Sequence, residues 1–137
     1  MIEQSQIFWP MLVQISLSVI ILFWLAYSRI SRISKQGMAE IRKTGFPTHV
    51  NNASDNFKNQ FEVPVLFYAL CIFFVVTKGV TDTVLIAAWV FVVARILHAL
   101  IQLTKNIIFP YRFLAFLISA LSVVVMTILA FLHLAAL

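Results

Sequence analysis

Three polar side chains interrupt a long apolar run and together could bind an anion or form interhelical hydrogen bonds. Arg95, His98 and Gln102 occupy positions i, i+3 and i+7, which lie within about 60° of one another on a helix that turns 100° per residue. An arginine at the centre of a membrane-spanning helix costs on the order of 3 kcal/mol. This face therefore needs a partner, a cavity or a ligand.

A second polar face lies at the edge of an earlier apolar run. Asp55, Lys58, Asn59 and Glu62 occupy positions i, i+3, i+4 and i+7. An unbroken helix would therefore place all four on one side. Glu62 is the carboxylate that we expect to balance Arg95. Pro64 removes a backbone hydrogen bond just after it, which predicts a bend that widens the gap beside the helix of Arg95.

Arg112, at the start of the last apolar run, completes the set of polar residues at one end of the chain's apolar segments. The cations Lys58, Arg95 and Arg112 outnumber Glu62, and the set stays one negative charge short even when Asp55 is counted. A small anionic ligand would complete it. The alternative is that these groups form a structural ion-pair network that holds helices or subunits together.

Other kinds of site find no support in the sequence. One cysteine and three histidines lack any zinc-binding spacing. Three glycines form no phosphate-binding loop, and no Ser–His–Asp set can be assembled. We expect no metal site.

The elements that must position these residues are membrane helices. With 62% hydrophobic and 11% charged residues in a chain of 137, the composition is that of a multi-pass integral membrane protein. We predict an all-α four-helix bundle in a single domain, 1–137, with helices over 7–28, 55–78, 82–104 and 111–136. The polar loop 29–54 between the first two includes an interfacial helix that is interrupted at residues 45–47.

Positive charge is distributed unevenly between the two ends of the predicted bundle. Residues 29–58 hold six Lys and Arg side chains, and Lys105 and Arg112 add two, against Lys78 alone in the second turn. The positive-inside rule places the first and third loops in the cytoplasm and both termini on the opposite side. The basic excess thus follows the membrane, and we expect the lipid bilayer rather than nucleic acid as its partner.

Two motifs resemble those of a known family. Ala94-Arg95-Ile96-Leu97-His98, with Leu103-Thr104, Pro110 and Arg112, is similar to the third- and fourth-helix signature of the MAPEG proteins, the membrane-associated proteins in eicosanoid and glutathione metabolism. Lys58-Asn59-Gln60-Phe61-Glu62 resembles the second-helix motif of that family. The resemblance covers nearly the whole chain.

The resemblance implies a homotrimer of four-helix subunits that holds glutathione, as co-substrate, near the cytoplasmic face between subunits. Asn59 and Glu62 match positions that contact glutathione, and Arg95 and His98 match positions that line the same site. Arg112 matches the arginine that stabilises the thiolate; a guanidinium stays charged at ordinary pH and favours the attacking species.

Some positions depart from the family pattern. Lys58 stands where several members have arginine, so the planar guanidinium that can bind a carboxylate through two parallel hydrogen bonds is missing. Gln102 and Phe116 stand where tyrosines are common in the family. We include Lys58 and Gln102 in the predicted glutathione site. Two functions follow as hypotheses. One is a glutathione transferase or glutathione-dependent peroxidase acting on lipophilic electrophiles, with Arg112 as its catalytic residue. The other is a non-catalytic membrane binding or scaffold protein of the same fold.

Overall fold

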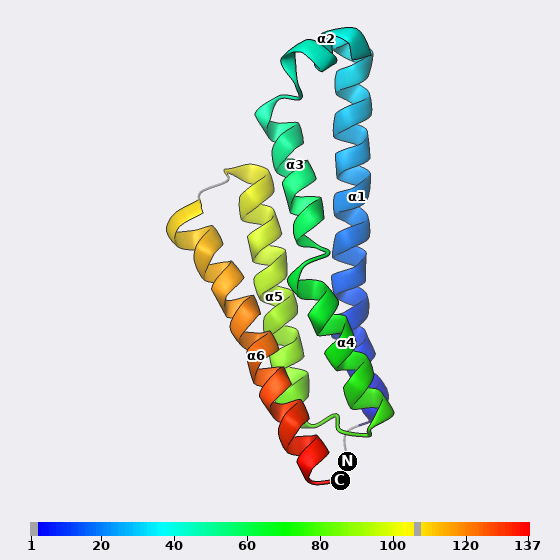
Figure 1. Cartoon of the computed structure of the whole chain (residues 1–137), viewed down its shortest axis with the longest axis vertical. Helices are drawn as coiled ribbons and strands as arrows, with labels where there is room; N and C mark the ends of the chain where they lie inside the picture. Colours follow the sequence, from blue (N-terminus) through cyan, green and yellow to red (C-terminus); the bar gives the residue numbers. More distant parts are fainter. Residues whose placement is uncertain (1–2, 106–107) are drawn as a thin grey trace.

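A computed structural model describes residues 3–105 and 108–137 of the chain, and these residues form an all-helical bundle (Figure 1). The elements, in order, are η1 (Gln4–Ile7), α1 (Phe8–Gln36), α2 (Met38–Thr44), α3 (Thr48–Asn59), α4 (Val63–Val76), α5 (Asp82–Thr104), η2 (Ile108–Arg112) and α6 (Phe113–Ala135). The predicted all-α fold class is confirmed.

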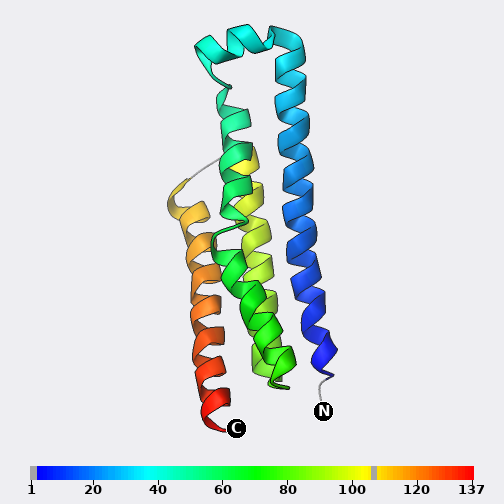
Figure 2. The ribbon, with the colours of Figure 1, turned by 45° about the vertical axis from the view of Figure 1, so that its right-hand side comes forward.

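Four stretches are long and apolar enough to cross a membrane, as predicted: Gln4–Gln36, Thr48–Val76, Asp82–Thr104 and Phe109–Ala135. They run side by side along the long axis, with α2 lying across one end and both chain termini at the other (Figures 1 and 2). The chain is therefore built as a multi-pass integral membrane protein.

The second span is broken rather than bent. The sequence predicts one helix over 55–78, but the structure forms α3 from Thr48 and ends it at Asn59, then starts α4 at Val63. Glu62 lies between them with φ −95° and ψ −102°, outside the helical region. Pro64 falls in the first turn of α4, where its missing N–H costs nothing.

The predicted loop 29–54 is mostly helical. Helix α1 continues past the predicted end at residue 28 as far as Gln36, and α2 and the start of α3 occupy most of the remainder. Gly37 and Gly45 flank α2 with φ of 78° and 77°, a conformation that favours glycine. The chain can therefore reverse twice, and the predicted interruption at 45–47 is present between α2 and α3.

The core is aromatic and aliphatic, and α5 lies at its centre. Phe67 of α4 stacks on Phe91 of α5 with ring centroids 4.3 Å apart, and Phe74 and Met126 are fully buried beside them. Large apolar side chains also cover the outside of the bundle; Phe23 and Ile20, for example, are 69% and 64% exposed. A surface of this kind suits contact with lipid acyl chains.

Polar contacts close the end of the bundle that carries the termini. Gln4 donates through Nε2 to the carbonyl of Val80 at 3.2 Å and accepts from its N–H at 2.9 Å. His133 Nε2 lies 3.1 Å from the carbonyl oxygen of Thr77. A Cβ on Gly79 would lie 2.5 Å from the His133 ring, so glycine is required for this close approach.

Candidate functional site

A polar cavity of about 240 Å³ opens beside the break in the second span. It is lined by Asn59 and Glu62 at the break, Arg95 and His98 of α5, and Arg112, Phe113 and Phe116 at the start of α6. The residues come from three of the four spans. Five of the seven residues predicted for the glutathione site therefore meet around one cavity.

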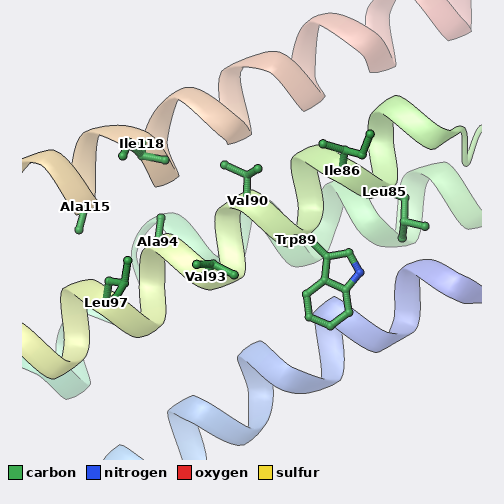
Figure 3. A pocket seen from close by; sticks show the side chains of 9 residues that line it. All are labelled: Leu85, Ile86, Trp89, Val90, Val93, Ala94, Leu97, Ala115 and Ile118. Carbon is green, nitrogen blue, oxygen red and sulfur yellow. The ribbon is translucent and has the colours of Figure 1, made fainter.

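Two larger hollows have a different character. A groove of about 470 Å³ along α5 is lined by apolar side chains, with Ala115 and Ile118 contributed by α6 (Figure 3). Another, of about 420 Å³, lies between α4 and α6 and is also almost wholly apolar. Grooves of this kind suit hydrocarbon, so polar chemistry belongs in the smaller cavity.

Arg95 is anchored to the main chain of α3. Its side chain is 1% exposed, and Nη2 donates to the carbonyl oxygen of Asn59 at 2.8 Å. Arg95 and Glu62 do not form a direct ion pair: within the described residues, the ion pair closer than 4.0 Å joins Lys58 and Asp55. Glu62 nevertheless lies near enough to act on the Arg95 guanidinium as a counter-charge. Glu62 lines the cavity that Arg95 also lines.

The break explains why Arg95 takes a carbonyl as its partner. A helix end leaves its last four carbonyl groups without intrahelical donors, and in a membrane each unsatisfied group is costly. Here all four accept a hydrogen bond: Asn56 O from Gln60 Nε2 (3.2 Å), Phe57 O from Gln60 N (3.1 Å), Lys58 O from Phe61 N (2.9 Å) and Asn59 O from Arg95 Nη2 (2.8 Å). The broken helix is thus fully capped.

A chain of buried amides ties the break to α1 and α5. Gln14 of α1 donates to Gln60 Oε1 at 3.0 Å, and Gln60 donates to Asn56 Oδ1 at 3.2 Å. Asn56 in turn donates to the carbonyl of Ala99 at 3.1 Å. All three amide side chains are at most 1% exposed. We call Gln14, Gln60 and Asn56 the amide relay; none of the three was among the residues predicted for the site.

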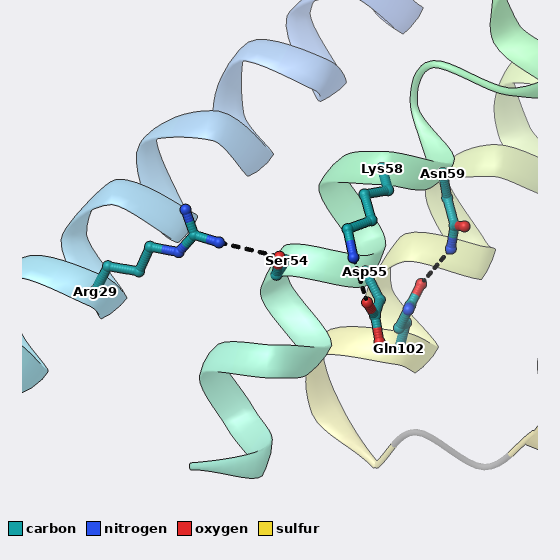
Figure 4. A network of polar contacts seen from close by, with 6 residues as sticks. All are labelled: Arg29, Ser54, Asp55, Lys58, Asn59 and Gln102. Atoms are coloured by element: carbon teal, nitrogen blue, oxygen red, sulfur yellow. Dashed lines mark hydrogen bonds and ion pairs between the residues drawn. The ribbon is translucent and has the colours of Figure 1, made fainter. Parts of the chain in front are cut away.

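Gln102 and Lys58 lie outside the cavity lining. Gln102 is buried and accepts a hydrogen bond from Asn59 Nδ2 at 3.0 Å, so it fixes the orientation of the Asn59 side chain (Figure 4). Lys58 is exposed and lies 3.5 Å from the Asp55 carboxylate on the same helix (Figure 4). The face predicted to join Lys58 with Glu62 does not form because α3 ends between them.

His98 and Arg95 each carry a buried nitrogen that faces no protein acceptor. Within the described residues, His98 Nδ1 and Arg95 Nε have no hydrogen-bond partner. His98 is 3% exposed, and its ring centroid lies 6.3 Å from that of Phe116. Buried polar atoms are normally paired with protein or water, and both residues line the cavity.

The charges around the cavity suit a small polar molecule that carries both signs. The lining includes two guanidinium groups, Arg95 and Arg112, and one carboxylate, Glu62. Guanidinium groups bind carboxylates with charge-assisted hydrogen bonds. In the part of the chain that the structure describes, no three His, Cys, Asp or Glu side chains gather as metal ligands do.

Comparison with known proteins gives one result that covers almost the whole chain. A family model described as the MAPEG family matches residues 7–132 of 137. No curated protein and no solved structure matches the chain.

Proposed function

The chain belongs to the MAPEG family, and we propose that it is a membrane-bound glutathione-dependent transferase or peroxidase acting on lipophilic electrophiles. The observation that carries the proposal is the single cavity in which Asn59, Glu62, Arg95, His98 and Arg112 come together. The family membership makes the chain a membrane protein of glutathione and eicosanoid metabolism, and the residues around the cavity point to glutathione as co-substrate.

The functional groups of glutathione complement the lining of the cavity. The tripeptide has two carboxylates, one ammonium group and one thiol, and the lining offers two guanidinium groups, one carboxylate and the Asn59 amide. Carboxylates would bind Arg95 and the ammonium group would bind Glu62. Gln102 supports the site indirectly, since it holds the Asn59 amide.

Arg112 is the residue that we assign to the chemistry. It lies at the start of α6 and lines the cavity. A guanidinium beside a thiol favours the thiolate. That sulfur attacks an electrophilic carbon and forms a C–S bond as the leaving group departs. With a hydroperoxide the sulfur attacks the terminal oxygen instead, the O–O bond breaks and the alcohol leaves, which gives a sulfenic acid. The thiol of a second glutathione then attacks that sulfur and forms the disulfide as water departs.

The assembly and orientation form part of the proposal. Following the family, we propose a homotrimer with glutathione held near the cytoplasmic face between adjacent subunits. Lys58, exposed on α3, would contact glutathione only from that subunit boundary, because it does not line the cavity within its own chain. The α2 end faces the cytoplasm, and the lipophilic substrate enters from the bilayer.

A second candidate function is favoured by the hydrogen bonding of Arg95. Its guanidinium caps α3, so this buried charge already has a structural task without any ligand. On this reading the protein is a non-catalytic binding or scaffold protein, and its polar groups hold the broken span in place. The network is made of carbonyl and amide contacts rather than of the ion pairs expected from the sequence.

Thermal unfolding of the purified protein with and without glutathione separates the two candidates. A ligand that binds only the folded state stabilises it by about 2.7 kcal/mol at one hundred times its Kd, which raises Tm by several degrees. Glutathione with its thiol methylated serves as a control for binding without thiolate chemistry. An unchanged Tm at millimolar glutathione would favour the scaffold.

A further inference from the structure

A second polar cavity lies at the α2 end of the bundle, away from the proposed glutathione site. Its volume is about 270 Å³, and it is lined by Arg32 and Gln36 of α1, Glu40 and Thr44 of α2, and the turn formed by Gly45, Phe46 and Pro47. Its lining is mixed in polarity, unlike the apolar grooves on the outside of the bundle. The proposed function uses none of these residues.

Opposite charges line this cavity without pairing. Arg32 Nε is buried and has no hydrogen-bond partner within the described residues. Glu40 lines the same cavity, yet within that part of the chain the ion pair closer than 4.0 Å is Lys58–Asp55. A guanidinium and a carboxylate held apart in this way can each bind a charge on one ligand.

The walls of the cavity are held in place by local structure. Gly37 and Gly45, both at positive φ, set α2 across the end of α1 (Figure 2). Arg29 lies over the Phe46 ring, 5.8 Å from its centroid, and donates to Ser54 of α3 at 3.1 Å (Figure 4). The turn that forms one wall is thus fixed to both α1 and α3.

The level of Arg32 along α1 matches the headgroup layer of a membrane. Trp24 and Tyr27, which are 50% and 67% exposed, have the character of interfacial anchors. Arg32 follows Tyr27 by five residues, a rise of roughly 7 Å along the helix axis. The polar layer on each side of a bilayer is about 5–7 Å thick, so the guanidinium reaches the level of lipid phosphates.

We propose that this cavity binds the headgroup of an aminophospholipid, with the phosphate at Arg32 and the primary ammonium group at Glu40. A phosphodiester accepts hydrogen bonds from a guanidinium, and a primary ammonium group has three N–H donors for a carboxylate. The trimethylammonium group of phosphatidylcholine has none. The site therefore selects phosphatidylethanolamine over phosphatidylcholine, and Glu40 disfavours the purely anionic phosphatidylglycerol.

Native mass spectrometry of the full chain in detergent micelles tests the proposal. Phosphatidylethanolamine, phosphatidylcholine and phosphatidylglycerol with identical acyl chains are added singly, and retained lipids are counted. We expect phosphatidylethanolamine to bind about tenfold more tightly than phosphatidylcholine, the size of one charge-assisted hydrogen bond. Equal retention of the two zwitterionic lipids would overturn the proposal.

Single-residue variants test which residue binds the phosphate and which binds the ammonium group of the headgroup. Arg32→Gln should lose the bound aminophospholipid, and Arg32→Lys, which keeps the charge, should retain part of it. Glu40→Gln should remove the preference for phosphatidylethanolamine over phosphatidylglycerol. Lys43→Gln, an exposed residue of α2 outside the cavity, is the matched control for loss of positive charge and should bind as the unmodified chain does. If Lys43→Gln loses as much lipid as Arg32→Gln, attraction to the basic surface explains the binding and the proposal fails.

A soluble headgroup distinguishes the lipid from a free metabolite of the same chemistry. O-phosphoethanolamine should displace the lipid only at high concentration, because it lacks the acyl chains that add membrane affinity. Displacement at concentrations equal to that of the lipid would overturn the assignment of a lipid as the occupant.

Discussion

Arg95 Nη2 donates a hydrogen bond of 2.8 Å to the main-chain carbonyl oxygen of Asn59, which is the last residue of α3. The C-terminus of a helix carries partial negative charge, so the guanidinium meets both an unsatisfied acceptor and the negative end of a dipole. The same side chain lines the proposed glutathione cavity. Arg95 therefore links the break in the second span to the polar cavity.

Replacing Arg95 should destabilise the bundle. In Arg95→Leu the Asn59 carbonyl loses its donor, and a buried unsatisfied group costs about 1–3 kcal/mol. Arg95→Lys keeps a charge and a donor and should retain part of the stability. Thermal unfolding followed by circular dichroism, in detergent and without ligand, gives both values. A Leu variant as stable as the original chain would show that the cap contributes nothing.

The amide relay should behave as one unit. Gln14→Leu and Gln60→Leu each break the 3.0 Å hydrogen bond between α1 and the break. Because the two changes remove the same contact, their destabilising effects should fall short of additive by about 1 kcal/mol. Urea or thermal unfolding of both single variants and the double variant measures this coupling energy. Strict additivity would mean that the two amides act independently.

Glu62→Gln separates a ligand contact from a structural ion pair. Glu62 is exposed and makes no ion pair closer than 4.0 Å among the described residues, so stability should change by no more than about 0.5 kcal/mol. Glutathione affinity should fall about tenfold, since a charge-assisted bond to the ligand ammonium group is lost. Calorimetric titration together with unfolding gives both numbers. Large destabilisation with unchanged affinity would support the scaffold function.

Arg112→Ala should remove thiolate formation and leave the assembly intact. Without the guanidinium, bound glutathione keeps its thiol proton, and conjugating activity should fall by about 10²-fold or more. The ultraviolet absorbance of the thiolate and the rate with a lipophilic electrophile report the two effects, and size-exclusion chromatography checks the assembly. Lys78→Ala, in the connection between α4 and α5 at the opposite end of the bundle (Figure 1), is the matched control. Full activity in the Arg112 variant would reject its catalytic role.

Cysteine labelling tests the predicted orientation. The native Cys71 is fully buried, so a membrane-impermeant maleimide should report only introduced cysteines. In intact cells, Lys78→Cys should react from outside, and Lys43→Cys should react only after the membrane is opened. The reverse pattern would place the α2 end outside the cytoplasm.

The sequence predicts the four spans well because hydropathy over some twenty residues is a strong signal. The cavity could be predicted in part, because Arg95 and His98 lie on one face of an unbroken helix and Arg112 begins the next. The break was predicted only as a bend. Its exact form depends on donors from other helices, namely Gln14 of α1, which donates to Gln60, and Arg95 of α5, which donates to the Asn59 carbonyl. These donors meet the end of α3 only after folding.

The partner of Arg95 illustrates why the remainder could not be predicted. Reasoning from residue types looks for a carboxylate and finds Glu62, whereas the actual acceptor is a main-chain carbonyl, which every residue possesses. Lys58 shows the related error. Helical periodicity places it beside Glu62, but that periodicity stops at Asn59, and the lysine faces Asp55 instead.

The interrupted second span also constrains the order in which the protein can be made. Helices α3 and α4 contain 12 and 14 residues, or roughly 18 and 21 Å, so neither crosses a bilayer core of about 30 Å alone. The two must enter the membrane as one segment. Arg95, which caps the break, follows later in the chain. The capped break is thus completed only when the third span has arrived, after insertion of the second.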